Sequence, residues 1–289
     1  MKKVTVKIPA KINLTLDVLG VKDGYHELNS LVASINIYDV ITVKPRNDGK
    51  ITLQNKGLPV DCPIIENNAY KAAKLFLDTF GTYGVDITVD KSIPVAGGLG
   101  GSSADIAGVL NALNALYGVN GDMSPLAGDL GSDSTYMLTG GYAVIKGRGD
   151  VVENQDIDKK VYLLLITEPA EISARNCYKK FDQKKKSFEP TTEKAVTAMH
   201  EGDLISAIPH LKNDLYQVAA ELVPNIKFNV FNLNKAGAKT ALLAGSGPTV
   251  FGVFADKKSR DAAYKKLTGL YGNNLLKAET VVPENGKFI

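Results

Sequence analysis

PVAGGLGGSSAD, residues Pro94 to Asp105, places four glycines and two serines directly ahead of a run with helical periodicity. Glycine permits left-handed backbone angles and close approach to a ligand, and the first turn of a helix offers unpaired N–H donors at the positive end of its dipole. The stretch therefore predicts a cradle for a phosphate group. A glycine-rich turn that serves only close packing is the alternative at this point.

The segments around this glycine loop predict a strand before it and a helix after it. VDITV at 85–89 alternates apolar and polar residues as a strand does, and Gly118 marks the end of the helix. The apolar positions of that helix are Ile106, Val109, Leu110, Leu113, Leu116 and Tyr117. No GxxxxGK[ST] sequence occurs, and no acidic residue ends a second parallel strand, so the loop is neither a P-loop nor a dinucleotide-binding turn.

Composition indicates an ordinary globular chain rather than a partner of polyanions. Its 289 residues are 44% hydrophobic and 22% charged, and 34 basic against 31 acidic residues leave a net charge of +3. The densest basic run predicts a solvated loop, so we expect no nucleic-acid partner; its members are Lys179, Lys180, Lys184, Lys185 and Lys186.

The cysteines and the N-terminus favour a reducing, cytoplasmic location. Cys62 and Cys177 form neither a CxxC pair nor a disulfide framework, and three histidines make a structural zinc site unlikely. MKKVTVKIPAKINL lacks the apolar core of a signal peptide, and no run is long enough to cross a bilayer. We therefore expect no membrane partner.

The order of elements predicts an α+β fold of two lobes. Strand-like alternation covers 4–8, 14–18, 31–37, 40–43, 142–146, 161–167, 240–243 and 249–254, and helical periodicity covers 67–80, 192–200, 213–222, 226–236 and 257–271. These types are mixed rather than strictly alternating. The turn-rich GRGD at 147–150 marks the expected boundary, with an N-terminal lobe at 1–152 and a C-terminal lobe at 153–289.

Three segments together resemble the GHMP small-molecule kinases: PAKINLTLDVLG at 9–20, the glycine loop, and LLAGSGPTVFG at 242–252. DGYHEL at 23–28 and LGSD at 130–133 resemble the branch that phosphorylates a cytidine diphosphate ester in the non-mevalonate isoprenoid pathway. NDLYQVA at 213–219 and GGYAVIKGRGD at 140–150 extend the similarity almost end to end.

The resemblance implies a ribosomal-S5-like N-terminal lobe and a ferredoxin-like C-terminal lobe with the active site in the cleft between them. It implies ATP as the phosphoryl donor, Mg²⁺ as its companion ion, and the C2 hydroxyl of the methylerythritol part of the ester as acceptor. We expect a monomer or a homodimer whose partner is this small-molecule substrate.

The same resemblance assigns the chemistry. Lys11 and Asp133 match the catalytic pair: Asp133 binds the acceptor hydroxyl as base or orienting group, and Lys11 holds that carboxylate. Ser103 is the hydroxyl expected at phosphate or Mg²⁺, and Asp105 either lies behind the metal or favours the helix dipole. The ATP phosphates are expected on Pro94, Val95, Ala96, Gly97, Gly98, Leu99, Gly100, Gly101, Ser102, Ser103 and Ala104.

For the acceptor, Tyr25 and Tyr178 match the aromatic residues on the two faces of the cytosine, and His26 matches the residue that reads its polar edge. Asn13 is expected at the diphosphate or the acceptor chain. Gly245, Ser246 and Gly247 form a second anion-binding turn expected to close over the substrate.

Three segments depart from the family pattern. Ser102 replaces a usual glycine, GSDSTY at 131–136 replaces GADVPF, and ISAR at 172–175 replaces VSTA, which exchanges a threonine hydroxyl for a guanidinium. These changes keep two alternatives open: a GHMP kinase with a different small acceptor, and a non-catalytic nucleotide-binding relative.

Overall fold

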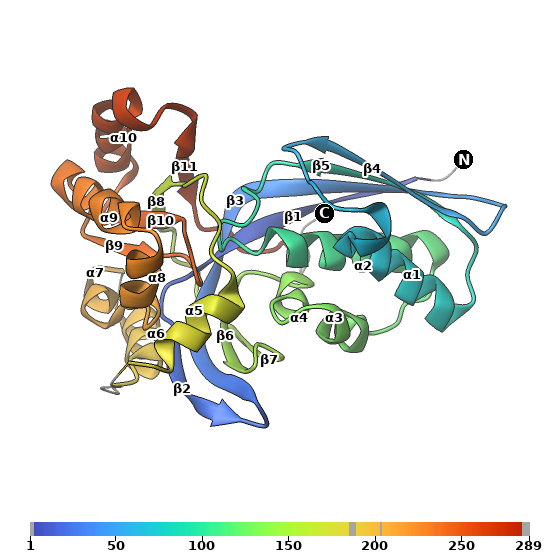
Figure 1. Cartoon of the computed structure of the whole chain (residues 1–289), viewed down its shortest axis with the longest axis horizontal. Helices are drawn as coiled ribbons and strands as arrows, with labels where there is room; N and C mark the ends of the chain where they lie inside the picture. The colour runs from blue at the N-terminus through green and yellow to red at the C-terminus, as the bar shows by residue number, and fades with distance from the viewer. Residues whose placement is uncertain (1–2, 185–188, 203, 285–289) are drawn as a thin grey trace.

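The computed structural model describes residues 3–184, 189–202 and 204–284, which build two β-sheets with helices packed on each (Figure 1). The first sheet has the order β4-β5-β3-β6-β7, with β1 and β2 also paired to β3. Its strands are β1 (Val4–Asn13), β2 (Asp17–Lys22), β3 (Tyr25–Pro45), β4 (Ile51–Gly57), β5 (Val85–Lys91), β6 (Tyr142–Gly147) and β7 (Val151–Gln155).

Strand β3 runs unbroken for 21 residues, where the sequence predicts two strands. Asn36 and Asp39 interrupt the apolar alternation, yet both are satisfied by tertiary contacts. The Asn36 side chain accepts a hydrogen bond from the Glu279 amide at 2.9 Å, and Asp39 accepts one from the Lys91 ammonium at 2.6 Å. β1 pairs with β3 along its length, with a shift of register between Pro9 and Ala10, and this carries Lys11 to the middle of the molecule.

The first sheet is covered by α1 (Asn68–Phe80), α2 (Gly101–Tyr117), α3 (Ser124–Leu130) and α4 (Ser134–Met137), with a short 3-10 turn, η1 (Ile64–Glu66), before α1. The expected helix at 67–80 is confirmed: the Asn67 side chain caps its start, and Gly81 ends it with φ 61°. α2 is buried almost all round, because β1 and β3 lie on one side of it and α1 on the other.

The second sheet is antiparallel throughout, in the order β11-β8-β10-β9. Its strands are β8 (Tyr162–Ile166), β9 (Thr240–Leu243), β10 (Val250–Phe254) and β11 (Leu275–Glu279). α9 (Asn225–Ala236) and α10 (Lys257–Tyr271) pack on it, and α5 (Ala174–Phe181), α8 (Tyr216–Leu222) and η3 (Gly272–Asn274) complete this part. The two sheets with their helices confirm the α+β, two-lobe fold class.

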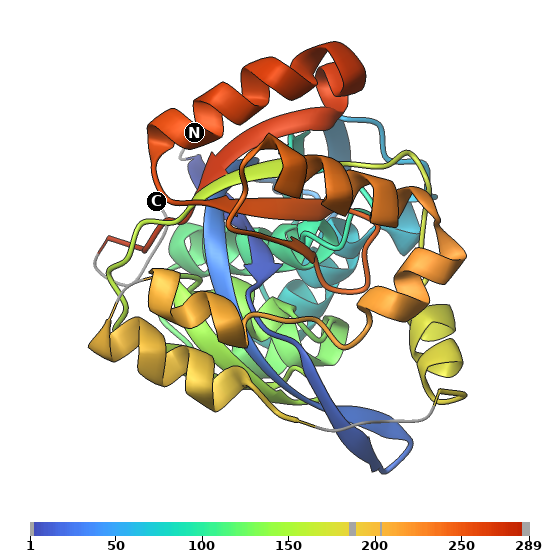
Figure 2. The same ribbon diagram turned by 90° about the vertical axis from the view of Figure 1, so that its left-hand side faces the viewer.

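Segments on both sides of the expected lobe boundary at 152/153 pack on the first sheet. β7 spans that position and pairs with β6, so the chain leaves the first sheet only after Gln155. The chain later returns to the first sheet, where α6 (Thr192–Glu201) packs on β3 rather than on the second sheet (Figure 2). α7 (Leu204–Ala207) and η2 (Ile208–His210) follow it against the same core.

A buried carboxylate fixes this return. Asp17 is fully buried at the start of β2 and accepts hydrogen bonds from the backbone amides of Thr191 and Thr192, both at 2.9 Å. Lys212 reaches the same carboxylate at 3.3 Å. The start of α6 is thereby tied to the first sheet. In the described part of the chain, no helix has the length and apolar character needed to cross a membrane.

Candidate active site

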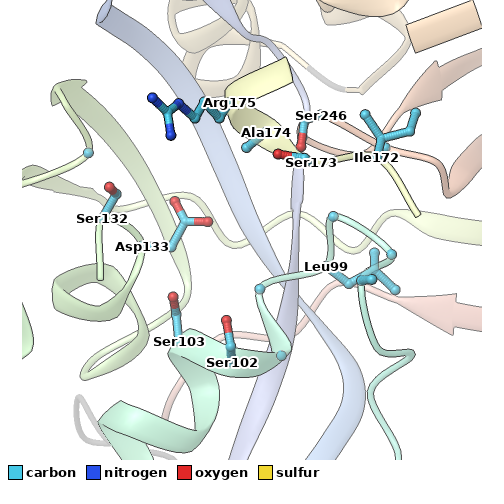
Figure 3. Close-up of a pocket in the computed structure, with 18 of the residues that line it drawn as sticks. Leu99, Ser102, Ser103, Ser132, Asp133, Ile172, Ser173, Ala174, Arg175 and Ser246 are labelled. Atoms are coloured by element: carbon cyan, nitrogen blue, oxygen red, sulfur yellow. The ribbon is translucent and has the colours of Figure 1, made fainter. Parts of the chain in front are cut away.

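A cavity of about 1340 Å³ opens between the two lobes and is lined by both. The first lobe contributes Lys11, Asn13, the glycine loop and Asp133, and the second contributes α5 and the turn at 245–247. Figure 3 shows the Ser102 and Ser103 hydroxyls directed from the start of α2 into this space, with Asp133 facing them and Arg175, Ser173 and Ser246 beyond. The structure therefore brings together segments that are more than 200 residues apart in the chain.

Lys11 and Asp133 form an ion pair with 3.1 Å between the Lys11 ammonium and Asp133 Oδ2. The Lys11 side chain is 5% exposed and the Asp133 side chain 33% exposed. A lysine this deeply buried needs a partner, because removing an unpaired charge from water is costly. Asp133, at the start of α4, supplies that partner and keeps part of its carboxylate open to the cavity.

Asn13 holds the Lys11 ammonium in place by a hydrogen bond. Its Oδ1 accepts a hydrogen bond from the Lys11 ammonium at 2.9 Å, and its Nδ2 donates to the Ser30 hydroxyl at 2.8 Å. Ser30 in turn donates to the Thr15 carbonyl at 2.5 Å. The sequence predicts contact between Asn13 and the diphosphate or the acceptor chain; Asn13 lines the cavity, and both ends of its amide also have partners within the protein. Its position makes it the residue that orients Lys11.

The glycine loop packs directly against Lys11. The Leu99 carbonyl accepts a hydrogen bond from the Lys11 amide at 3.0 Å. Gly98 and Gly100 both have φ 77°, and neither has room for a side chain. A Cβ on Gly98 would collide with the Ala244 carbonyl, and one on Gly100 would collide with Met137 and lie 3.0 Å from Lys11 Cγ. The glycines are thus required by backbone conformation and by close packing together.

Residues Pro94 to Ser103 line the cavity, as expected for a phosphate loop, but Ala104 does not. Its side chain is fully buried, and its amide donates to the Gly100 carbonyl at 2.8 Å. This bond is the first of the α2 ladder, so the Ala104 amide is not available to a ligand. The expectation for Ala104 is therefore corrected, and the free amides are those before it.

Beneath the loop lies a buried cluster of charge that the sequence did not reveal. The Lys91 ammonium lies 2.6 Å from Asp39 and 2.8 Å from Asp105. Burial raises the pKa of the Asp105 carboxyl to about 7, although Lys91 beside it acts in the opposite direction. Lys91 also donates to the Gly101 carbonyl at 3.3 Å. Asp105 thus points from the beginning of α2 into the protein interior, and the cluster ties the start of this helix and the glycine loop to β3 and β5.

The residues expected at the cytosine gather at the mouth of the cavity, where His26 stacks on Tyr178 with 4.6 Å between ring centroids. Tyr25 is 59% exposed and lies beneath the Arg148 guanidinium, 5.6 Å from the ring centroid. His26 Nε2 lies 2.9 Å from Asp182. Sequence reasoning missed Asp182; its place one helical turn after Tyr178 is the signal that could have identified it.

The second glycine turn is held by the NDLY segment at 213–216. Asn213 donates hydrogen bonds to the carbonyls of Leu243 at 2.9 Å and Gly245 at 2.7 Å. An added Cβ on Gly245 would lie 3.6 Å from the Lys11 ammonium. The turn Gly245, Ser246 and Gly247 therefore lies next to Lys11 at the cavity wall, and Asn213 sets its position; the predicted closure of this turn over the substrate stays a prediction.

The departure GSDSTY leaves this geometry intact. Tyr136 is fully buried; its hydroxyl lies 2.9 Å from the Ser34 hydroxyl and 2.7 Å from the Gly141 carbonyl that accepts its hydrogen bond. A tyrosine in place of phenylalanine is thus matched by polar partners inside the core. The ion pair of Asp133 with Lys11 is formed next to this segment.

The basic run at 179–186, predicted to be a loop, is helical at its start. Lys179 and Lys180 lie on α5, and Lys180 and Lys184 pair with Glu221 at 3.1 and 2.5 Å. Lys185 and Lys186 lie outside the described residues.

Comparison with known proteins gives a consistent result. The family pattern described as the GHMP kinases N terminal domain matches residues 67–144, and that of the GHMP kinases C terminal matches residues 194–273. A 4-diphosphocytidyl-2-C-methyl-D-erythritol kinase of Alkaliphilus metalliredigens is 34% identical over 280 residues, covering 94% of each chain. One from Pelotomaculum thermopropionicum is 39% identical over 263 residues, covering 89% of this chain and 91% of the relative.

Solved structures agree. A crystal structure of 4-(cytidine 5'-diphospho)-2C-methyl-D-erythritol kinase superposes with a TM-score of 0.80 at 30% identity, covering 96% of this chain and 98% of the other. A homoserine kinase from Cytophaga hutchinsonii has a TM-score of 0.71 at 18% identity over 98% of this chain and 95% of the other, and shares the fold.

Proposed function

Since the chain belongs to the 4-diphosphocytidyl-2-C-methyl-D-erythritol kinase family, a branch of the GHMP kinases, and is an ATP-dependent small-molecule kinase, we propose that it phosphorylates the C2 hydroxyl of that cytidine diphosphate ester. This reaction belongs to the non-mevalonate route to isoprenoid precursors. The observation that carries the proposal is the Lys11–Asp133 pair, 3.1 Å apart, at the point where both glycine turns meet.

Phosphoryl transfer requires an aligned acceptor and neutralised phosphate charge rather than covalent help from the protein. Asp133 keeps an open carboxylate face in the cavity, which accepts a hydrogen bond from the acceptor hydroxyl and takes its proton as the new bond forms. Lys11, held by Asn13, fixes that carboxylate and places positive charge toward the transferring group. The free amides at the start of α2 bind the phosphates of ATP.

The donor set fits a Mg²⁺ ion that arrives with ATP. Within the described residues no cluster of three histidine, cysteine, aspartate or glutamate side chains forms a metal cage. Mg²⁺ is commonly held by one or two protein oxygens together with substrate phosphates. The Ser103 hydroxyl, directed into the cavity opposite Asp133, supplies such an oxygen. The ion, when bound, neutralises phosphate charge.

The function is tested by measuring ADP release with four acceptors: the cytidine ester, homoserine, mevalonate and galactose. We expect turnover with the cytidine ester and at least a hundredfold lower kcat/KM with the others, because they lack the base and the diphosphate. Faster turnover with another acceptor would assign a different GHMP kinase activity. A folded protein that releases no ADP with any of the four contradicts the kinase mechanism itself.

We expect Tyr178→Ala to weaken binding of free CDP by roughly 1 to 3 kcal/mol, because it removes the ring on which a base stacks. His26→Ala should reduce the preference for CDP over UDP, since stacking alone does not separate the two bases. Calorimetric titration with both nucleotides measures each effect. ATP affinity should be unchanged in both variants.

Tyr83→Ala is the matched control, because Tyr83 is 73% exposed and lies outside the cavity. Its backbone carbonyl, which accepts a hydrogen bond from Tyr117, is retained in that variant. Wild-type protein that binds CDP no more tightly than UDP would remove the cytidine clamp from the proposal.

A further inference from the structure

Helix α5 presents two cations to the cavity that have no partner among the described residues. Arg175 and Lys179 both line the cavity, and neither side chain forms an ion pair or a hydrogen bond within that part of the chain. The neighbouring cation Lys180 instead pairs with Glu221 at 3.1 Å and does not line the cavity. The same helix therefore carries a satisfied cation on one face and two unsatisfied cations on another.

Other cations of the cavity wall have anionic neighbours. Lys11 pairs with Asp133, and Lys91 pairs with two buried carboxylates. Arg148 lies 3.9 Å from Asp150 and over the Tyr25 ring. The cations of the cavity wall that have no anionic neighbour within the described residues are thus the two on α5, while Glu171 and Asp182 also line the cavity on either side of that helix.

The placement of these cations is unfavourable unless an anion is bound. Arg175 and Lys179 are four residues apart, so they are neighbours on the helix surface and repel each other. Arg175 also lies in the first turn of α5, where the helix dipole disfavours positive charge. The Ser173 side chain at the helix start makes no capping hydrogen bond. The first turn of α5 therefore combines an uncapped backbone with an unpaired guanidinium.

The position of Arg175 indicates which anion it binds. Tyr178, which stacks on His26 at the base clamp, lies on α5 between the two cations. One helical turn advances 5.4 Å, which suits the step from a base to the phosphates of its nucleotide. Figure 3 shows Arg175 on the side of the cavity that faces Asp133 and Ser132. Base, diphosphate and acceptor hydroxyl would thus follow in order from Tyr178 past Arg175 to Asp133.

We propose that Arg175, with Lys179 beside it, binds the diphosphate of the acceptor, which makes Arg175 a specificity-determining residue of this chain. The inference rests on the proposed function for the nature of the acceptor. Arginine suits the task, because its planar fork donates two parallel hydrogen bonds to phosphate oxygens. Arg175 stands where the family pattern has an alanine, so the proposal gives its guanidinium the function of binding the diphosphate.

The test compares free CDP with cytidine, which lacks the diphosphate, by calorimetry in the presence of saturating β,γ-imido-ATP. We expect Arg175→Ala to weaken CDP binding about tenfold and to leave cytidine binding unchanged, whereas Arg175→Lys should recover part of the loss. Raised salt should weaken CDP binding to wild type more than to Arg175→Ala. Lys180→Ala is the control and should bind both ligands as wild type does, because Lys184 still pairs with Glu221.

Unchanged CDP affinity in Arg175→Ala would overturn the inference, as would an equal loss for CDP and cytidine, which would indicate a structural role. If wild type binds neither CDP nor cytidine, the proposed acceptor fails, and inorganic pyrophosphate then tests the anion site by itself. With the ATP site filled by the analogue, pyrophosphate binding that depends on Arg175 supports the site, and its independence from Arg175 rejects it.

Discussion

Asp133→Asn should lower kcat by on the order of a hundredfold or more while the protein remains folded. The substitution keeps the shape of the side chain but removes the charge and the proton-accepting oxygen that face the acceptor. KM for ATP should change little, because the phosphates contact the glycine loop rather than this carboxylate. Steady-state rates of ADP release with a thermal melt of each variant measure both properties.

Lys11→Ala should produce a loss of similar size by a different route. It removes the charge held by Asn13 at 2.9 Å and frees Asp133 from its partner at 3.1 Å. Asp129→Asn is the matched control for Asp133→Asn, since it makes the same change from aspartate to asparagine on α3, outside the cavity. Wild-type turnover in folded Asp133→Asn would show that another group orients the acceptor.

These two residues illustrate what the sequence could predict about the site. Lys11 and Asp133 lie in short motifs with a fixed local geometry, so the resemblance of those motifs to a family predicted their pairing. The glycine loop was predictable for the same reason, because its residues and the helix that follows are adjacent in the chain. Asp256 and Ser259 form a capping box at the start of α10, and the expected helix at 257–271 is confirmed.

The features that escaped prediction depend on contacts between distant residues. Lys91 joins Asp39 and Asp105, which lie 52 and 14 residues away, and no local pattern marks such a cluster. The position of α6 depends on Asp17, 175 residues before Thr192. At the base clamp the sequence predicts rings on Tyr25 and Tyr178, whereas the ring stacked on Tyr178 in the structure is that of His26.

Gly100→Val should abolish most activity, because this position meets two separate constraints. Its φ of 77° is a conformation that β-branched residues rarely adopt. A side chain here would also collide with Met137 and press on Lys11, whose Cγ lies 3.0 Å from the Cβ position. Met137 Cε is the end of a flexible side chain that can shift, whereas the strained φ and the contact with Lys11 Cγ remain, so we expect kcat/KM for ATP to fall by on the order of a hundredfold.

Gly118→Val tests the backbone strain of a positive φ without the collision found at Gly100. Gly118 ends α2 with φ 66°, and no atom lies within 4 Å of an added Cβ, so the variant has the backbone strain without the collision. It should lose stability and retain its KM for ATP. Ser102→Gly, which removes bulk from the same loop, should be neutral or beneficial to ATP binding. If folded Gly100→Val keeps the wild-type KM for ATP and wild-type turnover, the nucleotide phosphates bind elsewhere, because a ligand held by the amides of this loop would not tolerate the change of backbone conformation that valine imposes at φ 77°.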